Sequence, residues 1–412
     1  MKDGLTRGFI RELDGLRGIA ISLVLLHRFW PEQGPLHRFA KVAELGWVGV
    51  DLFFVISGFL IAGILLDTRS DPHYFRNFYA RRMLRIFPLY YVFVIGCLVV
   101  FPLMQRGPYL ETSFIKTAGS PLWYLLYLGN VPETIGYEPP FVLGPIWSLA
   151  IEEQFYIVFP FVVATLDMAK LRKLLLGLIL AAPVFRLVAL LLAPGNERIQ
   201  YLATPCRMDC ISLGCLLALT VRTASFDRKT VARAFGAALL VCAVGFPLGL
   251  LTRTTPWGRV LGYSVVAVTF GLLVLFVLQR RNERVTALLR VSSLRYLGKI
   301  CYGTYLLHRP ADVFVDKLTD RLGITDPLEA PDGLESVSIL LLKFGVAVVF
   351  ASASWYAFEK PILRLKDRFQ PENHPAEETK RPPASAGAAS PKVLTEVVPD
   401  LREMGETARN SG

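Results

Sequence analysis

The chain has 412 residues, of which 53% are hydrophobic and 19% are charged, and its formal net charge at pH 7 is +11. A mean hydropathy of +0.44 is too high for an ordinary soluble domain and is typical of a membrane protein. Basic loops beside anionic lipid headgroups account for the positive charge. We therefore expect membrane lipid, and no nucleic acid, as a partner.

Ten hydrophobic segments are about long enough to cross a membrane. The hydrocarbon core of a bilayer is about 30 Å thick and takes roughly 20 apolar residues of helix. Segments near that length occur at residues 13–31, 47–66, 84–104, 146–166, 173–193, 204–221, 234–251, 260–278, 295–314 and 336–357. They predict an all-α, polytopic integral membrane protein with about ten transmembrane helices.

Basic residues are distributed unevenly between the two sets of loops. If the N-terminus is cytoplasmic, the cytoplasmic segments hold 23 lysine and arginine residues and the opposite loops hold 11. The positive-inside bias then predicts that both termini are cytoplasmic and that the chain lies in the cytoplasmic (inner) membrane. The first apolar run contains Asp14 and Arg17 and has no small-residue cleavage site, so we expect no cleavable signal peptide.

The C-terminal residues differ in composition from the rest of the chain. Residues 371–412 contain no aromatic residue and six prolines, so they cannot bury enough apolar surface to offset their chain entropy. We predict a disordered cytoplasmic tail there, after a transmembrane domain over residues 1–370. The six cysteines have no histidine or third thiol at metal-ligand spacing, and we expect no metal site.

The first predicted span carries ionisable residues, which are costly inside a membrane. Asp14, Arg17 and His27 lie in an otherwise apolar run, and a charged side chain at the centre of a span costs ~2.5–3.5 kcal/mol. Arg82 and Arg85, at the start of the third span, share a helix face and lie on the same cytoplasmic side as Arg17. Because a guanidinium offers a rigid fork of donors, these three arginines predict a site for a cytoplasmic anion with several phosphates.

A second polar group is expected toward the outer side of the membrane. Its members come from the fourth, sixth and ninth spans and are Ser148, Glu152, Glu153, Arg207, Asp209 and His308. Since intramembrane charges usually pair, we expect at least one of the two glutamates to pair with an arginine such as Arg207. A direct role of a glutamate toward a substrate is the alternative.

Six stretches of the chain resemble motifs of the membrane-bound acyltransferase-3 family. In chain order they are LDGLRG at 13–18, GVDLFFVISGFL at 49–60, RMLRIFP at 82–88, WSLAIEEQFY at 147–156, YGTYLLH at 302–308 and FEKP at 358–361. Each stretch alone is weakly specific, but six in the family's order are strongly so, and they cover about residues 10–365. The resemblance implies an enzyme that moves an acyl group, most often acetyl, onto a carbohydrate.

The resemblance also implies a donor site. Arg17 matches the family's first-helix arginine, and Arg82 and Arg85 match its arginine-x-x-arginine pair. The implied donor is a cytoplasmic acyl-CoA, most often acetyl-CoA, which binds as a substrate, so no permanently bound cofactor is expected. The implied acceptor is a carbohydrate or glycoconjugate presented from the membrane or from its outer face.

The position of the general base departs from the family pattern. In the family the first-helix histidine is regarded as the base, which points to His27. The family has ten residues between this arginine and histidine, whereas nine separate Arg17 from His27, and Arg28 follows. Because one residue turns a side chain by ~100° around a helix, either the helix adjusts locally or another base serves, with His308 as the first substitute.

Direct transfer is the expected mechanism. His27 takes the proton from the acceptor hydroxyl, which attacks the thioester, and such general-base help is worth ~10²–10⁴-fold. A covalent acyl-enzyme through Ser57 or Ser148 is the alternative. A transporter or flippase of a lipid-linked or sugar substrate is the rival from another class, since buried charges near the midplane also fit transport. Binding of CoA by the arginines distinguishes the enzyme from the transporter.

Overall fold

The computed structural model describes residues 10–31, 35–104, 118–324 and 333–369, and its regular elements there are all helices. Ten of these helices are long: α1 (Arg11–Phe29), α3 (Val48–Asp67), α4 (Tyr74–Met104), α8 (Ile146–Thr165), α9 (Met168–Leu192), α11 (Thr204–Thr223), α12 (Arg228–Gly245), α13 (Tyr263–Gln279), α14 (Ser292–Leu322) and α15 (Gly333–Ser354). The predicted tail over 371–412 lies outside the described residues.

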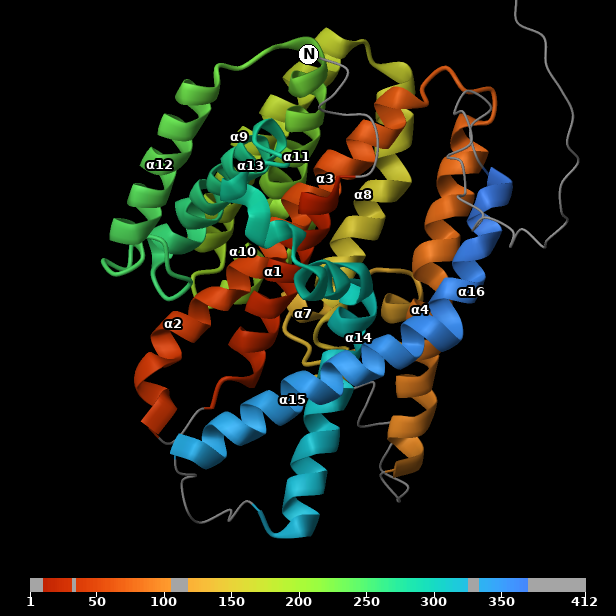
Figure 1. Ribbon diagram of the computed structural model, residues 1–412, viewed down its shortest axis with the longest axis vertical. Coiled ribbons are helices and arrows are strands. Elements are labelled where there is room, and N and C mark those ends of the chain that lie inside the picture. Colours follow the sequence, from red (N-terminus) through yellow and green to blue (C-terminus); the bar gives the residue numbers. More distant parts are fainter. Residues whose placement is uncertain (1–9, 32–34, 105–117, 325–332, 370–412) are drawn as a thin grey trace, which may run out of the picture. The chain divides into compact units, whose positions relative to one another are not determined.

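Short helical segments connect or continue the long helices. They are η1 (Pro35–Phe39), α2 (Ala40–Glu44), η2 (Leu45–Trp47), α6 (Leu122–Leu125), α7 (Asn130–Thr134), η3 (Phe141–Leu143), α10 (Glu197–Leu202), η4 (Gly258–Gly262), η5 (Arg284–Arg290), η6 (Trp355–Glu359), α16 (Lys360–Leu363) and η7 (Arg364–Phe369). In Figure 1, α3 and α11 run through the middle of the helices, with α12 at one margin and α4 and α16 at the other.

Each predicted span overlaps one of the long helices. Seven of these, together with the short segments that continue them, are long and apolar enough to cross a membrane: α3, α4, α8, α9, α11, α13 and α15. Helices α1, α12 and α14 also form but are not among the seven, since α1 and α14 carry many charged residues and α12 has only 18 residues. The all-α polytopic architecture is therefore confirmed, while the count of ten crossings stays a prediction.

Helix ends follow local sequence signals. The side chains of Asp167 and Asp227 accept hydrogen bonds from the backbone N–H groups of Lys170 and Thr230, both at 2.8 Å, and so cap α9 and α12. Gly323 ends α14 with a φ of 63°, a left-handed conformation that favours glycine. These local interactions define one end of each of the three helices.

Helices α1 and α14 touch backbone to backbone. A Cβ atom on Gly18 would lie 2.1 Å from the carbonyl oxygen of Leu294, and one on Gly298 would lie 1.9 Å from that of Asp14. Small residues at an interface are what allow membrane helices to approach this closely. The contact holds Asp14 and Arg17 beside the first turns of α14.

Helices α3 and α11 meet in the same way. A Cβ atom on Gly58 would lie 2.1 Å from the carbonyl oxygen of Ile211, and one on Gly214 would lie 2.1 Å from that of Val55. This contact fixes the rotation of α3 about its axis. Ser57, next to Gly58, is thereby directed away from α11 and toward α8, where the hydroxyl of Tyr156 meets it.

The predicted pairing of Arg207 with Glu152 or Glu153 is wrong. Arg207 forms its ion pair with Asp51 of α3, and both side chains are fully buried. The physical reason is the rotation of α11, since Arg207 and Gly214 are seven residues apart and so share the face that packs on α3. Arg207 therefore ties two helices together and does not neutralise a carboxylate of α8.

Candidate active site

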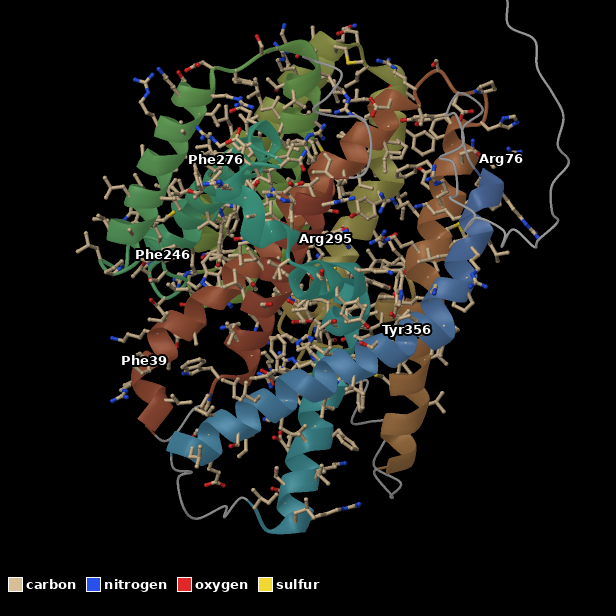
Figure 2. The ribbon with its side chains drawn as sticks, in the orientation of Figure 1. Phe39, Arg76, Phe246, Phe276, Arg295 and Tyr356 are labelled. Atoms are coloured by element: carbon tan, nitrogen blue, oxygen red, sulfur yellow. The ribbon has the colours of Figure 1, made fainter. Side chains whose placement is uncertain are left out.

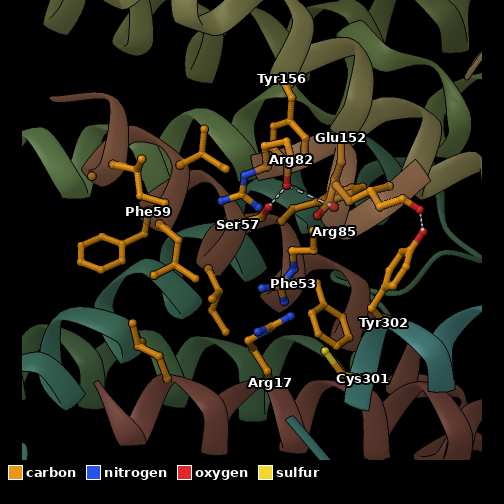
Figure 3. Close-up of a pocket in the computed structure, with 18 of the residues that line it drawn as sticks. Arg17, Phe53, Ser57, Phe59, Arg82, Arg85, Glu152, Tyr156, Cys301 and Tyr302 are labelled. Carbon is orange, nitrogen blue, oxygen red and sulfur yellow. Dashed lines mark hydrogen bonds between the residues drawn. The ribbon is translucent and has the colours of Figure 1, made fainter. Parts of the chain in front are cut away.

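A cavity of about 590 Å³ lies among α1, α3, α4, α8 and α14. Arg17, Arg82 and Arg85 line it, and Figure 3 shows their side chains directed into the same space. Apolar side chains such as Phe53 and Leu60 form much of the remaining wall. The structure thus brings together the three arginines that the sequence grouped from two different helices.

The positive charge of this cavity is poorly compensated. Arg82 and Arg85 form no ion pair or hydrogen bond with any other residue that the structure describes, although the Arg82 guanidinium lies 5.5 Å from the centroid of the Tyr156 ring. The nearest contact of Arg17 with a carboxylate is the 4.0 Å separation from Asp14. Because like charges repel in a medium of low dielectric constant, this arrangement favours binding of an anion.

A chain of hydroxyl and carboxyl groups crosses the same cavity. The hydroxyl of Tyr156 is hydrogen-bonded to that of Ser57 and donates to Glu152 Oε2 at 3.3 Å, as the dashed lines in Figure 3 show. Farther along α8, the hydroxyls of Ser148 and Tyr305 are 2.6 Å apart. Two members of the second polar group, Ser148 and Glu152, therefore meet the three arginines in one cavity, because Ser148, Glu152 and Tyr156 recur every four residues along one face of α8.

His308 lies directly behind the wall of the cavity. Its Nδ1 atom is 2.7 Å from the carbonyl oxygen of Tyr305, and its ring meets that of Phe29 edge to face with centroids 6.3 Å apart. A carbonyl oxygen only accepts, so Nδ1 carries the hydrogen in this contact and Nε2 keeps a lone pair. The geometry thus selects the tautomer in which Nε2 can accept a proton.

His27 faces a different part of the molecule. A Cβ atom added to Gly46 of η2 would lie 2.8 Å from the Cβ atom of His27, which shows that this side chain packs toward η2. The next residue, Arg28, faces α14 and forms an ion pair with Asp312 at 3.3 Å. At the position where the family spacing would place the histidine, this chain has Arg28, whose side chain is paired with a carboxylate of α14.

The remaining predicted site residues divide between the cavity and the core. Asp14 lines the cavity. Glu153 is buried beside it and interacts electrostatically with Arg82, but it does not reach the lining. Asp209 lies in the core, where its carboxylate is 2.9 Å from the guanidinium of Arg186. Asp209 therefore belongs to the packing of α9, α11 and α13, whereas Arg207 belongs to that of α3 and α11.

The sequence interpretation missed the tyrosines that link these groups. Tyr156 and Tyr305 were part of the motif stretches, yet no role followed from them. Their position one helical turn from Glu152 and from His308, respectively, is the signal that could have found them. No cluster of side chains suited to a metal ion occurs within the described ranges.

Comparisons with known proteins agree with this arrangement. The profile of the acyltransferase-3 family, described as an acyltransferase domain, matches residues 10–356. The chain belongs to this family. It is also 26% identical over 382 residues to a peptidoglycan O-acetyltransferase, OatA, of Listeria monocytogenes, and 29% identical over 378 residues to a putative peptidoglycan O-acetyltransferase, YrhL, of Bacillus subtilis. No solved structure matches.

These relatives are longer proteins. The alignments cover 87% and 86% of this chain but only 56% and 55% of the Listeria and Bacillus proteins, so the chain spans just over half of their length. The O-acetyltransferase OatA of Staphylococcus aureus shows the same relation, with 26% identity over 86% of this chain and 57% of its own length. Family membership and the apolar helices together identify a multi-pass membrane protein.

Proposed function

We propose that this protein is a membrane acyltransferase that moves an acyl group, in the first instance acetyl, from cytoplasmic acyl-CoA to a hydroxyl group of a carbohydrate. The observation that carries the proposal is the cavity in which Arg17, Arg82 and Arg85 converge beside the Ser57–Tyr156–Glu152 chain. Guanidinium groups bind phosphates strongly, and the apolar wall suits a pantetheine arm and an acyl group. Family membership supports the same reaction class.

The orientation in the membrane follows from the loops. The excess of lysine and arginine in one set of loops supports cytoplasmic termini in a cytoplasmic membrane. On that orientation the start of α1 and the start of α4, which carry the three arginines, lie on the cytoplasmic side. The donor would enter from the compartment that contains CoA, and the acceptor would approach from the other end of α1.

Two contacts support His308 as the general base in preference to His27. The tautomer of His308 leaves Nε2 with a lone pair, and Tyr305, to which it is hydrogen-bonded, lines the cavity together with Ser148. Neither histidine lines the cavity itself, and His27 packs toward η2. In direct transfer the oxygen of the acceptor hydroxyl attacks the thioester carbonyl while His308 accepts the hydroxyl proton. CoA then leaves as the thiolate.

The acceptor class comes from the names of the relatives. The Listeria protein is named as a peptidoglycan O-acetyltransferase, and this chain aligns with 56% of its length. We infer a cell-envelope glycan as the acceptor, with peptidoglycan as the first candidate. Incubation of membranes with labelled acetyl-CoA and isolated glycans, followed by mild alkaline release of acetate, measures the transfer directly.

The donor assignment is tested by the binding of acetyl-CoA to the purified protein. We expect the Arg82→Ala and Arg85→Ala double variant to bind acetyl-CoA about 10²–10⁴-fold more weakly, since each charge-assisted contact contributes about 1.5–3 kcal/mol and each 1.4 kcal/mol is tenfold. Arg76→Ala is the matched control, because Arg76 is exposed on the same helix and does not line the cavity (Figure 2). Unchanged binding by the double variant would contradict the proposal and leave a transporter as the better reading.

A further inference from the structure

A second cavity adjoins the first at two of the three arginines. It has a volume of about 460 Å³, and Asp14, Arg17 and Arg85 line both cavities. Its other walls come from the first turns of α14 and from Trp355, the first residue of η6. We refer to this space, bounded by Arg295, Lys299 and Trp355, as the α14 cavity.

The α14 cavity is strongly basic. Its charged lining consists of four cations, Arg17, Arg85, Arg295 and Lys299, against the single carboxylate of Asp14. Ser292, the first residue of α14, also lines it. The N–H groups of a first helical turn have no partner within the helix and favour negative charge, so they add to the potential of the side chains.

Two enclosed polar atoms in this cavity have no hydrogen-bond partner. They are Nε of Arg295 and Nε1 of Trp355, within the part of the chain that the structure describes. Buried donors of this kind normally find an acceptor, so two unpaired donors in one cavity point to a ligand that supplies one. The ammonium group of Lys299 lies 5.1 Å from the centroid of the Trp355 ring, which places a cation and an aromatic surface side by side.

We propose that the α14 cavity binds the 3′-phosphorylated adenosine end of the acyl-CoA donor, an inference that rests on the donor assignment made above. Arg295 and Lys299 contact the 3′-phosphate, and Trp355 provides the apolar surface against which adenine packs. Arg17 and Arg85, which line both cavities, contact the diphosphate. From there the pantetheine arm extends into the first cavity, so that the thioester lies beside the Ser57–Tyr156–Glu152 chain.

The division between the two cavities follows from the chemistry of CoA. Its nucleotide end carries the phosphates and the base, whereas the pantetheine arm and the acyl group are uncharged. The α14 cavity has cations and an indole, while the first cavity has an apolar wall beyond the arginines. An anionic lipid headgroup shares the phosphate chemistry but has no adenine and no arm that requires the first cavity.

The proposal is tested with three ligands and the full-length protein in detergent. Acetyl-CoA carries the whole donor, S-acetyl-4′-phosphopantetheine lacks the nucleotide, and adenosine 3′,5′-bisphosphate lacks the arm. The test variant combines Arg295→Gln with Lys299→Met. Arg284→Gln is the matched control, because Arg284 is exposed in η5 at the start of the same region and lines neither cavity. Calorimetry gives the dissociation constant of each ligand.

We expect the double variant to bind acetyl-CoA about 10²–10⁴-fold more weakly, as the loss of two charge-assisted contacts implies, and to lose adenosine 3′,5′-bisphosphate. Its affinity for S-acetyl-4′-phosphopantetheine should equal that of the wild type, which also shows that the variant is folded. Equal losses for both acetylated ligands, or no loss for either, would overturn the assignment of the α14 cavity while leaving the donor site intact.

Two further outcomes separate the alternatives. If the wild type binds none of the three ligands, the donor assignment itself fails, and the α14 cavity loses its proposed ligand with it. The measurements are repeated in nanodiscs with and without phosphatidylglycerol to examine a lipid headgroup. Competition by phosphatidylglycerol that disappears in the double variant, with unchanged affinity for acetyl-CoA, would assign the cavity to lipid and overturn the proposal.

Discussion

Replacement of Arg207 by methionine should leave the carboxylate of Asp51 buried without its ion-pair partner. Both side chains are 0% exposed, so water cannot replace the lost contact. Removal of one member of a buried pair costs about 3–5 kcal/mol, whereas replacement of both members by apolar residues is often neutral. We therefore expect Arg207→Met to destabilise the protein by about 3–5 kcal/mol, and Asp51→Leu in the same chain to recover most of that loss.

The reverse single variant should be milder. In the Asp51→Leu variant the guanidinium of Arg207 keeps its contacts with three aromatic rings. These are the rings of Phe54, Tyr201 and Tyr263, whose centroids lie 5.7, 5.2 and 4.5 Å away. A cation over an aromatic ring gains about 0.5–2 kcal/mol, so these rings offset part of the cost of the unpaired charge. The expected order of stability is wild type, the double variant, Asp51→Leu and then Arg207→Met.

Thermal unfolding of the purified variants in one detergent measures this order. At about 2–4 °C per kcal/mol, the Arg207→Met variant should unfold roughly 10 °C below the wild type. All variants are heated at the same rate, because unfolding of such proteins is commonly irreversible. Glu152→Gln combined with Arg207→Met provides the decisive comparison. Rescue by Glu152→Gln and none by Asp51→Leu would refute the pairing described here.

Three other predictions concern the site and its support. Gly298→Ala should lower both the unfolding temperature and the affinity for acetyl-CoA, because the added Cβ atom would lie 1.9 Å from the carbonyl oxygen of Asp14. Gly177→Ala is the control and should lower neither, because a Cβ atom there would have no neighbour within 4 Å. Tyr156→Phe should lower turnover about tenfold at unchanged donor affinity, since it removes a hydrogen bond to Glu152 but keeps the ring beside Arg82. A change in stability with unchanged turnover would mean that the hydroxyl is only structural. Burial raises the pKa of Glu133 in α7 to about 8, so stability should fall as the pH rises from about 4.5 to 8. Glu133→Gln should flatten that dependence in melting curves recorded across this range, and parallel curves would contradict it.

Much of the fold could be predicted from hydrophobic length alone. Each expected span overlaps a long helix, because about 20 apolar residues in a membrane leave the backbone no better way to satisfy its hydrogen bonds than a helix. The number of crossings was harder, since α1 and α14 combine apolar runs with many charges. Hydropathy by itself does not say whether such a helix is surrounded by lipid or by other helices.

The candidate site was predictable only in part. Arg82 and Arg85 share a face by their spacing, and the motif placed Arg17 with them, so the convergence of the three arginines followed from the sequence. The partner of Arg207 did not, because an ion pair between two helices depends on how each helix is rotated. That rotation is set by the close contact at Gly58 and Gly214, which has no signal in the residue types around Arg207.

The sequence by itself determined that this protein is a helical membrane protein of the acyltransferase-3 family with a basic site, because helix length, charge bias and motif spacing are local properties of the chain. Only the tertiary structure decided which polar residues share a cavity. It brought Glu152 to the arginines, directed Arg28 toward Asp312, and joined Arg295 and Lys299 of α14 to Arg17 of α1 and Arg85 of α4. Close contacts of glycines with backbone carbonyl oxygens position α1 against α14 and α3 against α11, and such contacts join residues that are distant in the chain.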